Sequence, residues 1–288
     1  MVLALIRTLR PRQWTKNIFI FTALAFDQKL HPGPELTATA IGFGLLCLLS
    51  GAVYIMNDLG DLESDRQHPA KRNRPLASGE LPIRLGVTTA AMLPLLALAL
   101  SFALGRRFGL VMLGYYLLNV AYTFWLKDVP VVDVMAIAAG FVLRVAAGVA
   151  LITVERFSPW LYLCMTLLAL FLGFGKRRAE LAQLGDNLVV RRALENYTLP
   201  QLDTYLTIVS AGTIMAYSLY TVFAENLPEN HLMMLTIPFV IYGLFRYLYL
   251  IHVRGEGSAP EELLLTDRPL QAAFLLWGLV ALGILYSN

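Results

Sequence analysis

The sequence has little charge, and this shortage excludes a soluble protein. Charged residues make up only 15% of its 288 residues, whereas hydrophobic residues make up 57%. Soluble domains usually carry about 25% charged residues, and the mean hydropathy of this chain is +0.62. The chain is more apolar than a soluble core of this size requires, so we expect lipid to cover much of its surface.

Cysteine and histidine are also scarce. Cys47 and Cys164 both lie in apolar runs, so they predict buried thiols and no disulfide framework. The four histidines are scattered, without the short spacing of a transition-metal site. The net charge of +3 is small, and no basic patch with interleaved aromatic residues indicates a nucleic-acid partner.

Long apolar runs are what the chain has instead. A membrane helix needs about 20 mostly apolar residues. About nine stretches meet this criterion, near residues 15–30, 36–57, 83–104, 108–126, 131–152, 158–175, 201–224, 232–251 and 270–287. The prediction is an all-α, polytopic membrane bundle in a single domain over residues 1–288. Residues 1–16 form an amphipathic basic segment expected at the membrane interface.

The basic residues predict the orientation. Most of the 23 lysines and arginines fall in the N-terminal segment and in the loops near 58–82, 127–130, 176–200 and 252–269. The opposite loops hold only Lys29, Arg106, Arg107 and Arg156. The side rich in Lys and Arg is cytoplasmic by the positive-inside rule, which places the N-terminus inside and the C-terminus outside. Most acids and amides share that side, so we expect the chemistry there.

An acidic motif closes the second apolar run. It consists of Asn57, Asp58, Asp61 and Asp65. If the helix continues through it, the three aspartates share one face and repel one another unless a cation bridges them. Mg²⁺ prefers oxygen ligands and often binds through carboxylates together with substrate phosphates. We therefore predict Asp58, Asp61 and Asp65 as Mg²⁺ ligands and Asn57 as an orienting amide; the alternative is a solvated acidic helix end.

Basic residues follow the acidic motif. Lys71 and Arg72 are explained by the positive-inside rule alone, whereas Arg74 directly precedes the rigid Pro75–Gly79 turn. Bases beside a metal site suit a phosphate-rich ligand, because the metal and the bases share its negative charge. Arg74 is therefore predicted to bind substrate.

These motifs together resemble the UbiA-type superfamily of intramembrane prenyltransferases, over essentially the whole chain. The resemblance implies a helical bundle whose central cavity opens to the cytoplasmic side and laterally into lipid. It also implies a Mg²⁺-bound diphosphate leaving group. Many members carry a second Asp-rich motif after the sixth span, where this chain has Lys176, Arg177 and Arg178 followed by Ala179 and Glu180. This basic replacement suggests more phosphate groups in the site than one diphosphate supplies.

Three further segments narrow the resemblance. Residues 10–17 read R-P-R-Q-W-T-K-N, residues 176–181 read K-R-R-A-E-L, and residues 263–271 read L-L-L-T-D-R-P-L-Q. They are similar to the decaprenyl-phosphate phosphoribosyltransferase branch, which implies transfer of 5-phosphoribose from phosphoribosyl diphosphate to a polyprenyl phosphate. The residues predicted to bind these substrates, besides Arg74, are Lys16, Asn17, Tyr122, Lys127, Asp133, Lys176, Arg177, Arg178, Asp267 and Arg268.

Arg144 is a separate candidate because it lies within the fifth apolar run. A charge inside the membrane costs about 2.5 kcal/mol or more on insertion scales and commonly marks a functional site. The alternative is an arginine paired with an acid on a neighbouring helix. Arg144 is added to the predicted substrate-binding residues.

Two other functions compete with phosphoribosyl transfer. A prenyltransferase that moves a prenyl group to an aromatic acceptor uses the same acidic motif, but the basic segment at 176–178 argues against it. A transporter or flippase for a phosphorylated lipid predicts broken helices or inverted repeats near the midplane, whereas the polar residues here gather at one face. Self-association of the chain is left open.

Overall fold

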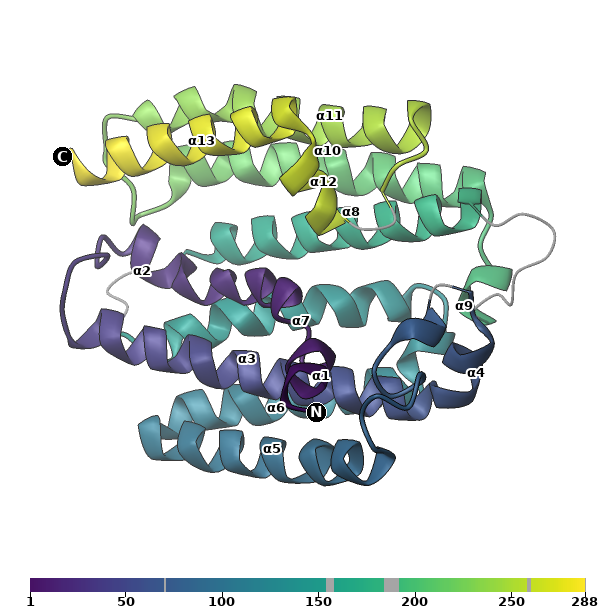
Figure 1. Cartoon of the computed structure of the whole chain (residues 1–288). Helices are drawn as coiled ribbons and strands as arrows, with labels where there is room; N and C mark the ends of the chain where they lie inside the picture. The colour runs from purple at the N-terminus through teal and green to yellow at the C-terminus, as the bar shows by residue number, and fades with distance from the viewer. Residues whose placement is uncertain (70, 154–157, 184–191, 258–259, 288) are drawn as a thin grey trace. The chain divides into compact units, whose positions relative to one another are not determined.

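The computed structural model describes residues 1–69, 71–153, 158–183, 192–257 and 260–287. All regular structure in these residues is helical (Figure 1), which confirms the all-α prediction. The α-helices and 3-10 helices (η) are, in chain order, α1 (Val2–Thr8), η1 (Pro11–Phe21), α2 (Thr22–Phe26), α3 (Pro34–Gly60), α4 (Leu62–Gln67), η2 (Lys71–Asn73), α5 (Ile83–Leu104), α6 (Arg106–Phe124), η3 (Leu126–Asp128), α7 (Val132–Val149), α8 (Pro159–Gln183), α9 (Arg192–Glu195), α10 (Leu199–Phe223), η4 (Leu232–Thr236), α11 (Ile237–Val253), α12 (Pro260–Thr266) and α13 (Arg268–Tyr286). Arg156 and part of the 176–200 loop, which entered the orientation argument, lie outside the described residues.

Seven helices in the described residues are long and apolar enough to cross a membrane: α3, α5, α7, α8, α10, the continuous segment Leu232–Val253 and α13. Each coincides with a predicted span, so the chain is a multi-pass membrane protein. The predicted span at 15–30 is not among the seven and stays a prediction; its residues form η1 followed directly by the five-residue α2. The span expected at 108–126 forms α6, which is not among the seven.

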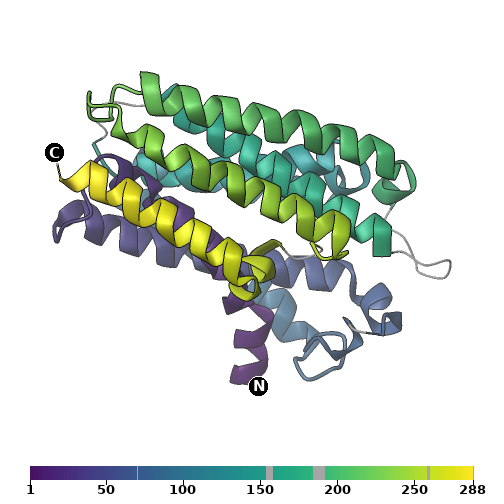
Figure 2. The same cartoon turned by 90° about the horizontal axis from the view of Figure 1, so that it is seen from above.

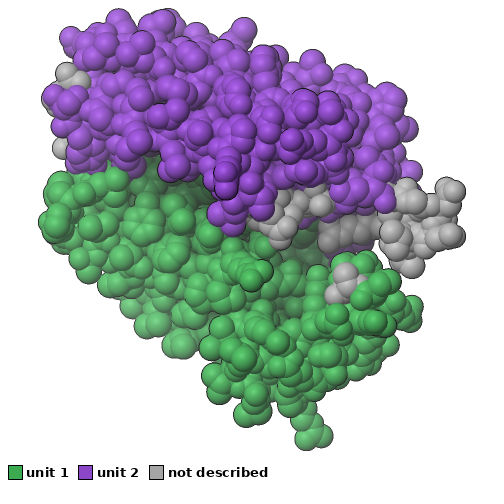
Figure 3. Space-filling view, turned by 45° about the horizontal axis from the view of Figure 1, so that its top comes forward, with its two compact units in different colours: residues 1–24, 29–126, 143–153 green, residues 25–28, 127–142, 154–288 purple. Residues whose placement is uncertain are grey.

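The described residues form two compact units, which Figure 3 shows in different colours. Unit 1 consists of residues 1–24, 29–126 and 143–153. Unit 2 consists of residues 25–28, 127–142 and 154–288. The boundary falls within α7. The single-domain organisation over residues 1–288 stays a prediction, and so does the central cavity.

In unit 1, α3 packs along α5 and α6 (Figure 1). The buried contacts are made by Leu46 and Leu49 from α3 and by Phe108 and Met112 from α6. Gly148 brings η1 directly against α7, because a Cβ atom at this position would lie only 1.9 Å from the Ile20 carbonyl oxygen. Only glycine permits this approach, so Gly148 is the position on α7 that Ile20 of η1 can contact through its backbone.

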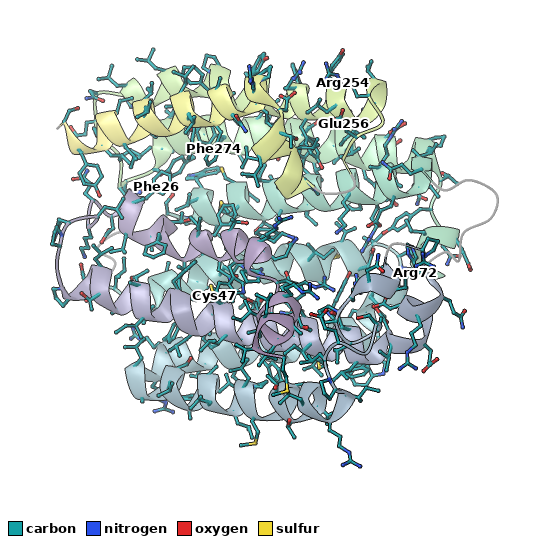
Figure 4. All side chains as sticks on the ribbon, in the orientation of Figure 1. Phe26, Cys47, Arg72, Arg254, Glu256 and Phe274 are labelled. Atoms are coloured by element: carbon teal, nitrogen blue, oxygen red, sulfur yellow. The ribbon has the colours of Figure 1, made fainter. Side chains whose placement is uncertain are left out.

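In unit 2, α8 packs against α10, and α11 runs beside α13 (Figures 1 and 2). The core of this unit contains Phe171 and Phe174 from α8 and Leu206 from α10. The outer face of α13 remains apolar, with Phe274 more than half exposed (Figure 4). Apolar outer faces of this extent are expected of helices that contact lipid.

Candidate functional site

The acidic motif lies where α3 ends. Helix α3 stops at Gly60, and Asp61 caps it with φ −97° and ψ 10°, its N–H bonded to the Asn57 carbonyl. A new short helix, α4, then begins. The three aspartates therefore do not share the face of one continuous helix, as expected from their spacing. Asp58 and Asp65 are buried, with exposures of 3% and 1%, and Asp61 is half-buried.

Two arginines hold the buried carboxylates. Arg74 Nη1 donates to Asp58 Oδ1 at 3.1 Å and to Asp65 Oδ2 at 2.6 Å, so one guanidinium joins the two acids. Arg10 Nη2 donates to the same Asp58 oxygen at 2.5 Å and stacks over the Tyr54 ring. Both arginine side chains remain more than a quarter exposed. The sequence predicted Arg74 at this site but missed Arg10, whose only signal was its place in the R-P-R-Q-W-T-K-N segment.

The turn after Arg74 is fixed by its own packing. Leu76 and Leu81 are buried in a small core with Ile55 of α3. The Leu81 N–H donates to the Pro75 carbonyl at 2.8 Å, which closes the turn. The proline and the buried leucines thus hold the Arg74 backbone beside α3.

The acidic cluster fits a divalent cation through two of its carboxylates. The described residues contain no group of three or more His, Cys, Asp or Glu side chains placed to hold a metal, so the predicted three-aspartate site is not preassembled. Asp65 Oδ1, however, is buried without a hydrogen-bond partner among the described residues. A buried carboxylate oxygen of this kind is costly unless it gains a ligand, and it suits the oxygen preference of Mg²⁺. Asp58 and Asp65 are the residues that would hold the ion.

Asn57 is held from α6. The hydroxyl of the buried Thr123 lies within hydrogen-bonding distance of Asn57 Oδ1. This contact fixes the amide next to Asp58, as an orienting role requires. Thr123 carries no motif, and nothing in the sequence indicated it.

The predicted residues Asn17 and Arg144 meet in a buried polar network of unit 1. Arg144 Nε donates to Asn17 Oδ1 at 2.9 Å, and Arg144 Nη2 donates to Tyr115 Oη at 2.9 Å. Asn17 Nδ2 donates onward to Ser50 Oγ at 3.1 Å. Arg144 and Gly148 are four residues apart, so the same face of α7 contacts η1 at both positions. The network fixes η1 and therefore the backbone of Lys16, the residue before Asn17.

Unit 2 contains a different charged cluster, centred on Arg177. Arg177 is 1% exposed; its Nε donates to Asp133 Oδ2 at 2.5 Å and its Nη1 to Glu180 Oε2 at 2.6 Å. Two carboxylates therefore already pair with Arg177, and its role in binding a phosphate stays a prediction. Asp133, predicted to bind substrate, is its fully buried partner. Arg177 lies on α8 and Asp133 on α7, and these helices approach closely where Gly173 lies against Val134.

Tyr197 completes this cluster and was not indicated by the sequence. Its hydroxyl donates to Asp133 Oδ1 at 2.8 Å and accepts the Val131 N–H at 2.5 Å. Burial raises the pKa of Tyr197, so the hydroxyl keeps its proton for Asp133. Val131 has φ +68°, a left-handed conformation that costs an L-residue roughly 1–2 kcal/mol and is an outlier for a β-branched side chain.

The other two bases of the predicted phosphate-binding segment are Arg178 and Lys176. Arg178 Nε donates to Asp203 Oδ1 at 3.0 Å, and its Nη1 donates to the Ile251 carbonyl at 3.2 Å. Lys176 is about a third exposed, with its Nζ 4.0 Å from Glu180 Oε1. Of the three bases, Lys176 is therefore the one most accessible from outside the unit.

Asp267 has a structural role that its motif did not reveal. It caps α13, accepting the Leu270 N–H at 2.9 Å, and it accepts two hydrogen bonds from Arg246. These contacts with Arg246 hold the pKa of Asp267 below its ordinary value. Arg268, the next residue, is exposed.

Tyr122 and Lys127 are both half-buried, but Tyr122 belongs to unit 1 and Lys127 to unit 2. Tyr122 was predicted from its nearness to Lys127 in the sequence, and its role in substrate binding stays a prediction.

Comparison with known proteins places this arrangement in a family. The profile of the UbiA prenyltransferase family matches residues 17–266. The chain belongs to the UbiA prenyltransferase family. As a UbiA protein with several apolar helices, it is a membrane transferase.

Within the UbiA family, the chain is similar to proteins called decaprenyl-phosphate phosphoribosyltransferase. The protein of Mycolicibacterium smegmatis is 32% identical over 100% of this chain and 94% of its own length. That of Mycobacterium tuberculosis is 33% identical over 96% of this chain and 92% of its own length. A UbiA homolog from Archaeoglobus fulgidus, solved with GPP and Mg²⁺ bound, matches 98% of this chain and 99% of its own with a TM-score of 0.74. At 21% identity, that likeness shows the UbiA fold alone.

Proposed function

We propose that this UbiA protein transfers 5-phosphoribose from phosphoribosyl diphosphate to a polyprenyl phosphate such as decaprenyl phosphate, and releases diphosphate. The observation that carries the proposal is the similarity to two proteins named for this reaction, which extends over nearly the whole of each chain. The acidic cluster of unit 1 supports it, because two buried carboxylates lie beside two partly exposed guanidiniums.

The groups in this cluster suit the departure of a diphosphate. Asp58 and Asp65 would hold Mg²⁺, which neutralises charge on the leaving group when bound. Arg10 and Arg74 lie at the edge of the cluster, where N–H groups of their partly exposed side chains can donate to phosphate oxygens. Asn57, fixed by Thr123, orients either a carboxylate or the ligand. These preset donors favour the charge that develops as the bond breaks.

The reaction needs no strong base. The ribose C1–O bond breaks with oxocarbenium character, and the electron pair leaves with the diphosphate. An oxygen of the polyprenyl phosphate, already ionised at neutral pH, forms the new bond to C1. Lys16, Lys127 and Lys176 are the bases proposed to bind the ribose 5-phosphate and the lipid phosphate.

We place this reaction at the cytoplasmic face of the cell's inner membrane. The N-terminus is inside and the C-terminus outside, as the distribution of Lys and Arg favours. The polyprenyl tail lies in a membrane-facing groove of the bundle. A reporter fused to the C-terminus that is active only outside the cytoplasm supports this orientation, and one active in the cytoplasm refutes it.

The experiment that tests the function compares two donors. Purified protein with Mg²⁺ receives labelled phosphoribosyl diphosphate and polyprenyl phosphate in one reaction, and labelled prenyl diphosphate and an aromatic acid in the other. Label from phosphoribosyl diphosphate should enter lipid in the wild type and not in Asp58→Ala. Label transferred only from prenyl diphosphate overturns the proposal in favour of an ordinary prenyltransferase.

A further inference from the structure

The segment that carries Lys127 is joined to α7 through a strained residue. Among the described residues, non-glycine positive φ values occur at Arg10, Gln28, Val131 and His231. Val131 is the only β-branched residue of these four. Valine resists this conformation more than the others because its two γ-methyl groups crowd the backbone. Such strain persists only where surrounding contacts enforce it.

The contacts that enforce it come from one side chain and one helix. Tyr197 Oη accepts the Val131 N–H at 2.5 Å. The Val131 carbonyl accepts the Met135 N–H at 2.9 Å and so starts the hydrogen-bond ladder of α7. Both backbone groups of Val131 are therefore held, one by a hydroxyl group and one by the helix.

Tyr197 itself is held by Asp133. Its hydroxyl donates to Asp133 Oδ1 at 2.8 Å, and the other oxygen of this carboxylate accepts from Arg177 at 2.5 Å. Tyr197 is 5% exposed, and Asp133 and Arg177 are almost fully buried. The charged cluster of unit 2 thus orients the Tyr197 hydroxyl toward the N–H of the strained residue Val131.

We infer that Tyr197 is a positioning residue, which holds Val131 in its left-handed conformation and thereby sets the direction of the Lys127–Pro130 segment. The reason is geometric. The Val131 carbonyl is anchored in α7. A change in the φ angle of Val131 therefore rotates the chain that precedes Val131 and moves Lys127 from its present position. The inference rests on the proposed function, in which Lys127 binds a substrate phosphate.

The test is a double-mutant cycle of Tyr197→Phe and Val131→Gly. Tyr197→Phe removes the hydroxyl, so Val131 relaxes and Lys127 moves; we expect kcat/KM to fall roughly tenfold, mainly through KM for the phosphate-bearing substrate. Glycine adopts positive φ without strain. In Tyr197→Phe/Val131→Gly the native turn should therefore return, and most of the tenfold loss should be recovered.

Matched controls separate positioning from packing. Tyr205→Phe removes a hydroxyl that accepts a hydrogen bond from exposed Gln201 on α10, and it should leave kcat/KM unchanged. Val132→Gly places glycine at the first residue of α7, where φ is not positive, and it should not rescue Tyr197→Phe. If Tyr197 only stabilises the fold, Val131→Gly adds its own loss to that of Tyr197→Phe, and the absence of rescue overturns the inference.

A second readout does not depend on the reaction catalysed. In detergent, the decrease in Tm caused by Tyr197→Phe should be larger in the Val131→Gly background than in the wild type, because release of the valine strain offsets part of the loss in the wild type and glycine has no such strain to release. If neither donor yields product but this coupling is present, the proposed function fails and the inference that Tyr197 holds Val131 stands. If product forms but the decreases in Tm are additive and no kcat/KM is recovered, the inference about Tyr197 fails and the proposed function stands.

Discussion

The charged clusters of the two units are built in opposite ways. In unit 1 the acids are buried and the bases lie at the edge: Asp58 and Asp65 are at most 3% exposed, whereas the Arg10 and Arg74 side chains are 29% and 27% exposed. In unit 2 the base is buried, with Arg177 at 1%, and the accessible member is Glu180 at 26%.

This difference separates an open cluster from a closed one. An exposed arginine can exchange a carboxylate for a substrate phosphate at little cost, which leaves the carboxylates to a cation. A buried arginine between two acids cannot leave without uncovering buried charge. Unit 1 therefore suits ligand exchange, and the unit 2 cluster suits the support of its surroundings.

The largest effect is expected from removing a buried acid of unit 1. Asp58→Ala and Asp65→Ala should each lower turnover by about a hundredfold or more, because in the proposed reaction both carboxylates would hold the cation that neutralises charge on the leaving group. Glu63→Gln, at a largely exposed side chain of the same segment, should remain active. Activity assays at saturating Mg²⁺, with Tm as the folding check, measure the loss; near-normal turnover in Asp58→Ala contradicts the role of the buried acids.

Asp61→Ala, predicted from the motif to be equally severe, tests whether the half-buried aspartate is also a ligand.

Breaking the unit 2 pair should affect stability first. Arg177→Met or Asp133→Leu alone leaves an uncompensated buried charge, and each should cost about 3–5 kcal/mol of unfolding free energy. The double variant should recover much of the loss, since apolar residues then fill the site. Denaturant unfolding in detergent measures all three variants.

The opposite result is equally informative. If Arg177→Met keeps its stability and raises only KM for a phosphate-bearing substrate, then Arg177 is the phosphate-binding residue predicted from the sequence, and the contrast between the units fails.

A smaller effect is expected at the accessible edge of unit 1. Arg74→Ala should raise KM for the donor by roughly ten- to a hundredfold, because a hydrogen bond to a charged group contributes about 1.5–3 kcal/mol. Arg72→Ala serves as the control, since Arg72 is exposed and is explained by membrane orientation. Unchanged KM in Arg74→Ala would show that this arginine stabilises the acids without contacting substrate.

The smallest effect concerns the pair at the start of α13. Arg246 lowers the pKa of Asp267 below its ordinary value of 3.8. A lowered pKa means that the stabilisation is complete above pH about 4 and is lost as pH falls through the folded-state pKa. Between pH 5 and pH 3 the Tm of the wild type should fall by about 2–4 °C more than that of Asp267→Asn. Equal decreases in the two proteins would remove Asp267 as the cause.

Part of the candidate site could be predicted from local sequence. Asp58 and Asp65 end a long apolar run, and Arg74 precedes a proline turn, so their shared location followed from the order of the segments. Asp61 shows the limit of that reasoning, because α3 ends at Gly60 and α4 begins at Leu62, and the spacing of the three aspartates does not reveal this break. Arg10 joins the cluster across 48 positions, which no spacing rule covers.

The sequence by itself determined the environment and the chemistry of this protein. Long apolar runs require lipid and helices, since backbone groups in a membrane must bond within their own segment, and acids beside bases suit a metal and phosphates. The tertiary structure alone decided which charges remain available. Arg177 and Asp133 are 44 positions apart and Tyr197 and Asp133 are 64 apart, and only the packing of α7 against α8 and the segment after α9 brings them together. Burial then determines their role, because a charge taken out of water must keep its partner, whereas one left at the edge can exchange it.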